Sequence, residues 1–485
     1  MKLLAGIDLG TTTLKGIIIN EQGEVLSTRK LPAEYEYPQK DVVEFSSERF
    51  YQKFCLLIKE LLDKLSDSGQ IVAVSLSGAT GNTLLLDKNN KPLRKTISWL
   101  DKRSLDFSTV LHGINYKEIY QIVGWPFLEI FPLAHLIWLK TKNPKVYRSA
   151  SRYLLNISYL YYRLTGRFVM DYSTATTFYL QDQEKRIWHK PFLDLLGISG
   201  PQLPELLPSG TRICNLNDQS AEETGLPRET QVVLGSFDHP AAARGAGVLQ
   251  EGSLLLSCGT SWVGLYPIKN RHTGLDNKML IDPFLSPAGP WAAMFSIPGI
   301  GKTIDTLINH LVKKEYLPKK HDLFTQKASQ SPPGAHHVTL EILKPAEQLI
   351  ADLLEVRKTH CINDVFRAIM EVTAFEIKRN MDYYEKKGLK VREITMVGGA
   401  SESKLWRHIL ADITGHPIRF LNGQIAGALG STIMAGIGAG LFRDEKEGFA
   451  RIGGSPMTIN PDPKNTGAYK VFYQKYLKKY HNTKH

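Results

Sequence analysis

The sequence predicts a two-domain α/β protein. The chain has 485 residues, about three times the length of a typical single domain. Apolar strand patterns alternate with helical patterns along it, which is typical of sheets covered by helices. A strand, a glycine–threonine turn and a second strand occur near the N-terminus, and the same unit returns after residue 250. A duplicated core unit is the simplest explanation of this return.

The N-terminal elements read as a hairpin, a third strand, a helix and a buried strand. Residues Leu3–Ile19 contain the strand LLAGIDL, the turn GTTT and the strand LKGIIIN, which is a hairpin signal. Val25–Leu31 can add a third strand. Ser46–Leu65 shows the apolar spacing of an amphipathic helix, and Ile71–Leu76 is an apolar run typical of a buried strand.

The middle of the chain ends the first domain and starts the second. A tyrosine-rich helix is predicted over Ser151–Leu164, and Gln231–Gly235 is another apolar strand. Ser253–Ser257, the turn CGTS and Trp262–Tyr266 repeat the N-terminal unit. We place the boundary within Gly245–Glu251, which gives domains 1–247 and 248–485.

The C-terminal part predicts two helices on either side of a strand. Apolar residues at helical spacing indicate a helix over Asn363–Lys386, followed by a strand over Glu393–Val397 and a helix over Lys404–Ile413. The last residues, 475–484, carry lysines among tyrosines. We interpret them as a solvated terminal helix.

Composition restricts the class of function. Sixty Lys and Arg against 48 Asp and Glu give a net charge of +12, which favours anionic ligands. The basic residues are spread out, so we expect no nucleic-acid partner. Four distant cysteines suggest neither a zinc site nor a disulfide framework, and no apolar stretch approaches the roughly 18 residues of a membrane span. A cytoplasmic protein is expected.

The first turn is a candidate phosphate site. Gly10, Thr11, Thr12 and Thr13 offer hydroxyls and backbone N–H groups suited to phosphate oxygens, and Lys15 adds a positive charge. An ordinary hairpin with β-favouring threonines is the alternative. Just before the turn, Asp8 ends a buried strand, where an unpaired carboxylate is costly. It can serve Mg²⁺ through water, or it can bond its own turn amides.

A second acidic residue follows the strand at 231–235. Asp238 precedes a small-residue helix, and phosphoryl transfer to an alcohol needs a carboxylate that accepts the hydroxyl proton. Asp is also a favoured helix N-cap, and Pro240 fits a first helical turn, so capping is the alternative role. The turn Gly259, Thr260 and Ser261 is a second candidate phosphate element. We expect Asp8 and Asp238 to meet in one pocket.

Taken in order, these motifs resemble those of the FGGY carbohydrate kinase family, which lies within the actin, hexokinase and heat-shock-protein-70 superfamily. The resemblance extends over residues 3–442. Its D-x-G-T-T-S-x-K/R element is matched by Asp8, Gly10, Thr11, Thr12, Thr13 and Lys15, with Thr for the usual Ser. Its G-x-x-D-x-x-x-x-x-x-G-x-G element is matched by Gly235, Asp238, Gly245 and Gly247, and Gly259, Thr260 and Ser261 match the second phosphate element. The adenosine element is matched from Met396 to Asp412 through Gly398, Gly399, Ala400 and Ser403.

The resemblance implies two ribonuclease-H-like domains with an interdomain catalytic cleft. It implies an enzyme that phosphorylates a hydroxyl of a ketose or polyol with ATP and Mg²⁺, with Asp238 as the base and Asp8 and Asp238 at the metal through water. Dimers are common in this family, so a homodimer is one expectation. Three departures affect expected contacts: His135 replaces a frequent Lys, Ser403 a common Asn and His408 a common Gln.

The resemblance leaves the sugar open. Thr80 and Gly81 stand where xylulose kinases carry a Met-His pair, so the sugar site is altered. Trp99, Asp101 and Arg103 match the family's W-x-D-x-R substrate segment, in which an aromatic face and a carboxylate–guanidinium pair suit a polyol. The alternative is a core Trp beside a surface ion pair. His239 is expected to reach a sugar hydroxyl, with capping or packing as alternatives.

Other readings of the sequence remain. Glycerol, a tetritol or gluconate are alternative substrates, and an ATP-dependent binding protein on the same core is an alternative function. The GKT at 301–303 lacks the first glycine of a P-loop, so a loop that enters a helix over Thr303–Leu311 is expected instead. This loop can border the nucleotide site. His336 and His337 have no third ligand nearby and are expected at the surface.

Overall fold

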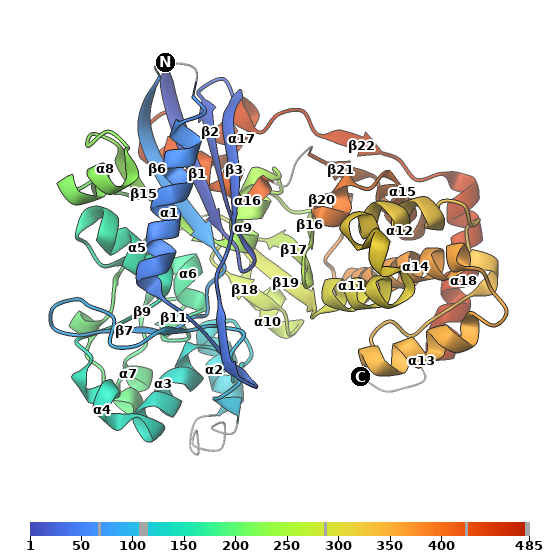
Figure 1. The fold of residues 1–485 in the computed structure, drawn as a ribbon, viewed down its shortest axis with the longest axis horizontal. Helices are drawn as coiled ribbons and strands as arrows, with labels where there is room; N and C mark the ends of the chain where they lie inside the picture. Colours follow the sequence, from blue (N-terminus) through green and yellow to red (C-terminus); the bar gives the residue numbers. More distant parts are fainter. Residues whose placement is uncertain (66–68, 106–114, 286–288, 422–424, 481–485) are drawn as a thin grey trace. The chain divides into compact units, whose positions relative to one another are not determined.

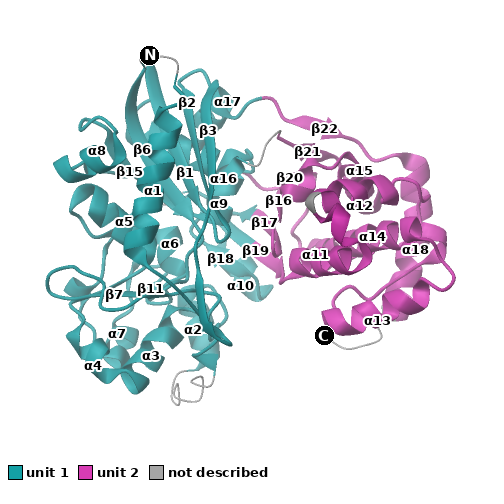
Figure 2. Cartoon of the chain, in the orientation of Figure 1, with its two compact units in different colours: residues 1–249, 267–293, 425–454 teal, residues 250–266, 294–424, 455–485 magenta. Residues whose placement is uncertain are grey.

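A computed structural model describes residues 1–65, 69–105, 115–285, 289–421 and 425–480 (Figure 1). Contacts divide the chain into two compact units (Figure 2). Unit 1 comprises residues 1–249, 267–293 and 425–454, and unit 2 comprises residues 250–266, 294–424 and 455–485. The α/β class is confirmed. The predicted domains, 1–247 and 248–485, divide the chain at one point in the sequence and stay a prediction. The two units instead group residues by their contacts, so each unit combines separate segments of the chain.

Unit 1 is built on a six-stranded sheet in the order β14-β15-β6-β1-β2-β3. The strands are β1 (Lys2–Leu9), β2 (Thr13–Asn20), β3 (Val25–Pro32), β6 (Gln70–Gly78), β14 (Arg212–Asn215) and β15 (Gln231–Phe237). Strands β1 and β2 form the predicted antiparallel hairpin, and β6 is parallel to both β1 and β15. The continuous apolar runs of β1 and β6 are buried, as expected for parallel strands covered on both faces.

Helices α9 and α16 cover the parallel strands of this sheet. Ala428, Ile433 and Met434 of α16 share a core cluster with Leu4 of β1 and Val233 of β15. The helices of unit 1 are α1 (Ser47–Leu62), α2 (Tyr116–Val123), α3 (Pro132–Lys142), α4 (Pro144–Ser149), α5 (Asn156–Thr165), α6 (Tyr172–Thr176), α7 (Lys190–Leu196), η2 (Gly200–Gln202), α8 (Asp218–Thr224), α9 (Asp238–Gly245), α10 (Arg271–Asp276), α16 (Ala426–Gly438) and α17 (Glu445–Ile452).

Short strands complete unit 1 and correct one prediction. They are β4 (Glu36–Gln39), β5 (Val42–Phe45), β7 (Leu84–Leu86), β8 (Thr96–Ile97), β9 (Arg152–Leu154), β10 (Val169–Asp171), β11 (Gln181–Asp182), β12 (Ile187–Trp188), β13 (Glu205–Leu207) and β18 (Leu280–Asp282). The helix predicted from Ser151 begins only at Asn156, because Arg152–Leu154 pair with β7.

Unit 2 repeats the hairpin arrangement of unit 1. Strand β16 (Ser253–Cys258) is antiparallel to β17 (Trp262–Ile268) and parallel to β20 (Glu393–Gly398). The remaining strands are β19 (Trp291–Ile297), β21 (Ile418–Phe420) and β22 (Met457–Ile459). The helices are α11 (Ile300–Leu311), η3 (Lys314–Lys319), α12 (Lys320–Ala328), η4 (Ala335–His337), α13 (Ala346–Val356), α14 (Ile362–Glu385), η5 (Gly399–Glu402), α15 (Lys404–Thr414) and α18 (Pro463–Tyr480).

The terminal helix α18 is docked on one face, which corrects the expectation of a solvated helix. Tyr469, Tyr473 and Tyr476 recur at helical spacing and are buried. Each hydroxyl donates a hydrogen bond to a carboxylate of α14; the acceptors are Glu371, Asp382 and Glu376, respectively. The lysines of α18 face outward, together with other residues such as Val471 and Gln474. Residues 481–485, with Lys484, lie outside the described residues.

Within the ranges given above, the structure contains no helix with the length and apolarity that crossing a bilayer requires.

Helices α9 and α16 pack so closely that only glycine fits at their contact. A Cβ atom at Gly430 would lie 1.8 Å from the carbonyl oxygen of Ala241. We therefore expect Gly430→Ala to lower the free energy of unfolding by about 1–3 kcal/mol, because the helices must move apart. The measurement is the urea midpoint. Gly467→Ala in α18, where no atom lies within 4 Å, is the control and should leave the midpoint unchanged or raise it slightly. Equal midpoints for both variants would show that the contact is not tight.

Candidate active site

The topology of unit 1 brings Asp8, in β1, and Asp238, directly after β15, to the same end of the sheet. Strands β1 and β15 lie on either side of β6. Asp8 is in register with Ser77 of β6, and Phe237, the residue before Asp238, is in register with Gly78. Two strand spacings correspond to about 10 Å between the two backbones, which is within reach for converging side chains.

Asp8 is a carboxylate with an unsatisfied oxygen. Its Oδ1 is buried and has no hydrogen-bond partner among the described residues, so this atom does not bond the turn amides as one alternative expected. Burial raises the pKa of Asp8 to about 7; the facing charge of Lys15 opposes this shift, and the charge of Asp238 adds to it. Asp8 therefore gains from any cation or donor that reaches Oδ1.

Asp238 is the first residue of α9 and remains partly accessible. Its side chain is 29% exposed, and its Oδ1 accepts a hydrogen bond of 2.7 Å from the amide of His239. The N-cap position belongs to Phe237, so the alternative of Asp238 as N-cap is wrong by one residue. Burial raises the pKa of Asp238, and the neighbouring His239 opposes this. A partly exposed carboxylate of raised pKa is suited to accept a proton.

An aromatic cluster adjoins Asp238, and sequence reasoning missed it. The ring centroid of Trp125 lies 5.8 Å from the ring centroids of both Phe131 and Phe237, and the centroid of Tyr179 lies 5.4 Å from that of Phe131. The ring of His239 contacts Phe237 edge to face at 5.4 Å. We call Trp125, Phe131, Tyr179 and Phe237 the aromatic wall. The dense aromatic residues from Trp125 to Phe131 were its only sequence signal.

The Thr80–Gly81 segment is fixed by neighbours of this wall. Thr80 is buried, and its hydroxyl accepts a hydrogen bond of 2.8 Å from Thr177. Gly81 has a φ of +76°, and a Cβ atom there would lie 2.5 Å from the ring of Phe131. Phe131 therefore occupies the space into which a side chain at position 81 would project.

The Trp99, Asp101 and Arg103 segment is held mainly by its own contacts. Asp101 is buried and accepts hydrogen bonds from the Val43 amide and from Nε and Nη2 of Arg103 at 2.7, 2.8 and 2.7 Å. The expected alternative of a surface ion pair is therefore not observed. The indole Nε1 of Trp99 donates to the Thr11 hydroxyl at 3.1 Å, which ties this segment to the β1–β2 turn.

The structure places His135 in the interior of α3. Its Nδ1 lies 2.9 Å from the Thr83 hydroxyl, while its Nε2 is buried without a partner among the described residues. Burial lowers the pKa of His135 to about 3, so the imidazole is neutral. A neutral ring replaces the cation that a Lys would bring.

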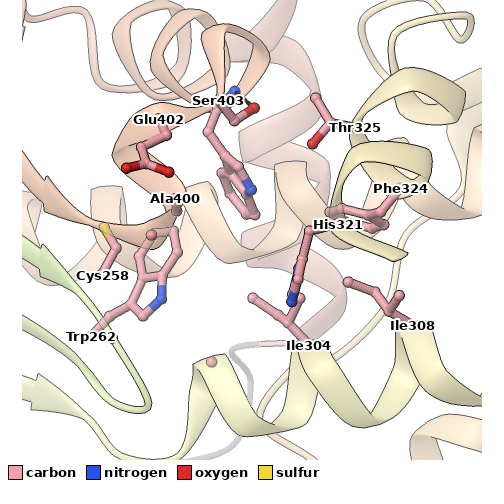
Figure 3. A pocket seen from close by; sticks show the side chains of 14 residues that line it. Cys258, Trp262, Ile304, Ile308, His321, Phe324, Thr325, Ala400, Glu402 and Ser403 are labelled. Atoms are coloured by element: carbon pink, nitrogen blue, oxygen red, sulfur yellow. Dashed lines mark hydrogen bonds between the residues drawn. The ribbon is translucent and has the colours of Figure 1, made fainter. Parts of the chain in front are cut away.

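Unit 2 contains a cavity of about 380 Å³ beside the predicted adenosine element (Figure 3). Of the predicted nucleotide residues, Gly259, Gly399, Ala400 and Ser403 line it. Glu402 and Trp406, which also line it, fall within the predicted adenosine element. The lining residues that sequence reasoning did not assign to this site are Cys258, Trp262, Ile304, Ile308, His321, Phe324 and Thr325. Gly301, from the GKT segment, also lines it, as the expected border position suggested.

The other predicted nucleotide residues lie elsewhere. Gly398 ends β20, and the carbonyl of Thr260 accepts from the Gly301 amide at 3.0 Å. The Ser261 hydroxyl accepts from the Gly299 amide at 3.0 Å, which fixes the second turn against the start of α11. Gly10, Thr11, Thr12, Thr13 and Lys15 form the β1–β2 turn and the start of β2 in unit 1.

Ser403 and two tryptophans shape the wall of this cavity. The Ser403 hydroxyl caps α15 by accepting from the Trp406 amide at 3.3 Å. The ring centroids of Trp262 and Trp406 lie 5.1 Å apart, and both residues line the cavity. A flat base can pack on such rings, which suits adenosine.

The donor set of unit 1 is compatible with Mg²⁺ bound partly through water. Among the described residues, no group of three or more His, Cys, Asp or Glu side chains is arranged as a metal site. Mg²⁺ needs fewer protein ligands, because it keeps several waters and uses one or two carboxylates with substrate phosphates. The unsatisfied Oδ1 of Asp8 is a suitable oxygen ligand.

Comparison with known proteins gives the family. The N-terminal domain of the FGGY family of carbohydrate kinases matches residues 3–245, and its C-terminal domain matches residues 254–439. The chain belongs to the FGGY family of carbohydrate kinases. It is 27% identical to a xylulose kinase of Staphylococcus epidermidis over 100% of this chain and 97% of that protein. It is 25% identical to an autoinducer-2 kinase of Klebsiella pneumoniae over 98% and 93%, respectively.

The fold is also that of a solved FGGY kinase. A ligand-bound xylulose kinase from Lactobacillus acidophilus superimposes with a TM-score of 0.86 at 20% identity, over 99% of this chain and 97% of that one. The chain is therefore a carbohydrate kinase with the two-domain α/β fold of its family, and kinases of this family use ATP.

A second unsatisfied carboxylate lies in the interior of unit 1, near Asp238. Asp282, at the end of β18, is fully buried; its Oδ2 accepts a hydrogen bond of 2.8 Å from the Ser173 hydroxyl, and its Oδ1 has no partner among the described residues. Burial raises the pKa of Asp282 to about 7; Ser173 opposes this shift, and the charge of Asp171 adds to it.

This pKa predicts a pH-dependent stability. The folded-state pKa lies above the unfolded value of about 4, so the contribution of Asp282 is favourable in acid and is lost as the pH rises through 7. Asp282→Asn should remove this loss. Relative to the wild type, the variant should therefore gain about 1 kcal/mol or more between pH 5 and pH 8, measured by urea unfolding.

The exposed Asp276→Asn variant is the control for this comparison and should show no such gain. A stability difference between Asp282→Asn and the wild type that is the same at both pH values would contradict the raised pKa.

Proposed function

We propose that this kinase transfers the terminal phosphoryl group of ATP to a hydroxyl of a ketose or a related polyol, with Asp238 as the general base. The observation that carries the proposal is Asp238 itself. It is a partly exposed carboxylate of raised pKa, beside an aromatic wall and at the same sheet edge as Asp8. A base in this position can accept the hydroxyl proton as the phosphoryl group is transferred.

The sugar is proposed to bind in unit 1 beside the aromatic wall. Apolar C–H faces of a polyol pack on aromatic rings, and polar groups fix its orientation. His239, on the side of Phe237, is proposed to contact a sugar hydroxyl. Thr80, Gly81 and Trp99 are proposed to shape the site. Asp101 and Arg103 hydrogen-bond to one another. We therefore propose that they hold the segment from Trp99 to Arg103 in place and do not contact the sugar themselves.

The phosphates are proposed to bind the two threonine-bearing turns, and adenosine the cavity in unit 2. Gly10 to Thr13 with Lys15, and Gly259 to Ser261, supply backbone N–H groups and hydroxyls for phosphate oxygens. Residues Gly398 to Ser403 are proposed to border the bound adenosine. Asp8 and Asp238 would hold Mg²⁺ through water, and the bound ion would neutralise charge on the phosphates. The catalytic cleft between the two domains stays a prediction.

The sugar is proposed to differ from that of a typical xylulose kinase. Thr80 and Gly81 replace the Met-His pair, and the ring of Phe131 leaves no room for a side chain at position 81. Ketoses other than D-xylulose, glycerol, tetritols and gluconate are therefore candidates, together with autoinducer-2, because autoinducer-2 kinases are among the relatives. The membership in a kinase family disfavours a non-enzymatic ATP-dependent binding protein.

Replacement of the proposed base tests the mechanism. Asp238→Asn keeps the size of the side chain but removes the proton acceptor, so kcat should fall about 10²–10⁴-fold. The measurement is ADP release in a coupled assay with the best substrate. Asp194→Asn, which changes a largely exposed carboxylate paired with Lys190, should keep wild-type activity. A folded Asp238→Asn variant with near-wild-type kcat would reject the assigned role.

A substrate screen tests the altered sugar site. At least one ketose or polyol of the candidate panel should give a higher kcat/KM than D-xylulose, again measured as ADP release. Phe131→Ala should change the ratio of kcat/KM between that substrate and D-xylulose about tenfold or more, because the variant enlarges the pocket. The control is Phe127→Ala. Phe127 lies outside the aromatic wall, next to Tyr179, and its replacement should preserve the ratio. D-xylulose as the best substrate, or an unchanged ratio in Phe131→Ala, would contradict the proposal.

A further inference from the structure

A second cavity of unit 2 is separate from the nucleotide pocket. It has a volume of about 350 Å³, close to the 380 Å³ of the nucleotide pocket, and the two share no lining residue. Its walls come from the turn at 334–339, from α14 and from the C-terminal helix α18. Cavities of this size are sufficient for a small-molecule ligand.

The floor of the cavity is aromatic, and the charge of its acidic residue is compensated by hydrogen-bond donors of the protein. Phe375 and Tyr476 are 4% and 2% exposed. The one acidic lining residue, Glu371, accepts hydrogen bonds at Oε1 from the Gly334 amide at 3.0 Å, from Arg367 at 2.7 Å and from the Tyr469 hydroxyl at 2.7 Å. Its charge is therefore satisfied within the protein, and the floor does not repel an anion.

The mouth of the cavity is basic. Lys475 and Lys479 are exposed and lie one helical turn apart on the same face of α18. Lys475 makes no hydrogen bond or ion pair with any described residue. An anion placed between two ammonium groups on one helix face is attracted to both. The ring of His337, also at the mouth, lies 5.8 Å from that of Phe472.

One wall of the cavity is a strained turn. Gly334, Ala335, His336 and His337 have φ values of +86°, +46°, +49° and +71°. The left-handed conformation is unfavourable for each of the three non-glycine residues, because it brings Cβ too close to the following carbonyl oxygen. The turn is held by Glu371 at Gly334 and by Asp364, whose Oδ1 lies 2.7 Å from Nδ1 of His336. Strain of this kind persists where packing enforces it, and it is frequent at ligand sites.

We propose that this cavity binds a small organic phosphate with a flat ring, of the size of a nucleoside monophosphate. The ring would pack against Phe472 and Phe375, and the phosphate would lie between the ammonium groups of Lys475 and Lys479. The site is independent of the kinase reaction, because it uses none of the residues assigned to catalysis or to either substrate.

Lysine labelling tests the position of the site. Pyridoxal 5′-phosphate is a flat ring phosphate whose aldehyde forms an imine with a nearby lysine and releases water; added borohydride then reduces the imine. The nucleotide pocket is first saturated with a non-hydrolysable ATP analogue. Lys475 or Lys479 should be labelled at least tenfold faster than Lys470 and Lys478 on the same helix, as measured by peptide mass spectrometry, and excess AMP should slow this labelling. Equal labelling of all four lysines, or no effect of AMP, would overturn the proposal.

Calorimetry with AMP tests the affinity under the same saturation. The wild type should bind AMP at this second site, and both Lys475→Gln/Lys479→Gln and Phe472→Ala should raise the dissociation constant at least tenfold. Lys470→Gln/Lys478→Gln, which removes the same charge from the same helix outside the cavity, should bind as the wild type does. Circular dichroism checks the fold of each variant. Absence of AMP binding by the wild type, or equal weakening in both lysine pairs, would contradict the site.

Discussion

The convergence of two carboxylates of raised pKa at one end of a parallel sheet is the constraint on which the candidate active site depends. Strands β1 and β15 end on either side of β6, so Asp8 and Asp238 leave the sheet at nearly the same level. Burial raises the pKa of both groups. A carboxylate that is shielded from water and has no partner costs free energy, and a cation that reaches it offsets this cost. The tight contact of α16 with β1 and α9 keeps these strand ends together.

Sequence patterns were sufficient where a residue's role follows from its neighbours in the chain. The β1–β2 hairpin, its repeat at β16–β17 and helix α14 follow from local periodicity and turn residues. The family could be recognised because its motifs are short and contiguous. Even there, the sequence pattern placed the N-cap of α9 at Asp238, one residue late; the N-cap is Phe237, which makes no side-chain capping hydrogen bond.

Features that depend on distant contacts could not be predicted in this way. Phe131 and Tyr179 lie far from Asp238 in sequence, and only the folded chain brings them to Trp125 and Phe237. The same holds for His321 and Phe324, which line the cavity proposed to bind adenosine. The sequence pattern placed the tyrosines of α18 in a solvated basic tail. Only the structure identifies their carboxylate partners on α14. Tertiary packing therefore decides both which residues form the aromatic wall and how the C-terminal helix is docked.

Metal binding tests most directly whether Asp8 is poised for a cation. The measurement is the affinity for Mn²⁺, used in place of Mg²⁺, in the presence of a non-hydrolysable ATP analogue, followed by the electron paramagnetic resonance signal of the free ion. If the unsatisfied oxygen of Asp8 serves the metal, Asp8→Asn should weaken Mn²⁺ binding at least tenfold while the protein stays folded. The same Mn²⁺ affinity in the wild type and in Asp8→Asn would contradict this role and remove the physical reason for keeping a buried carboxylate at that position.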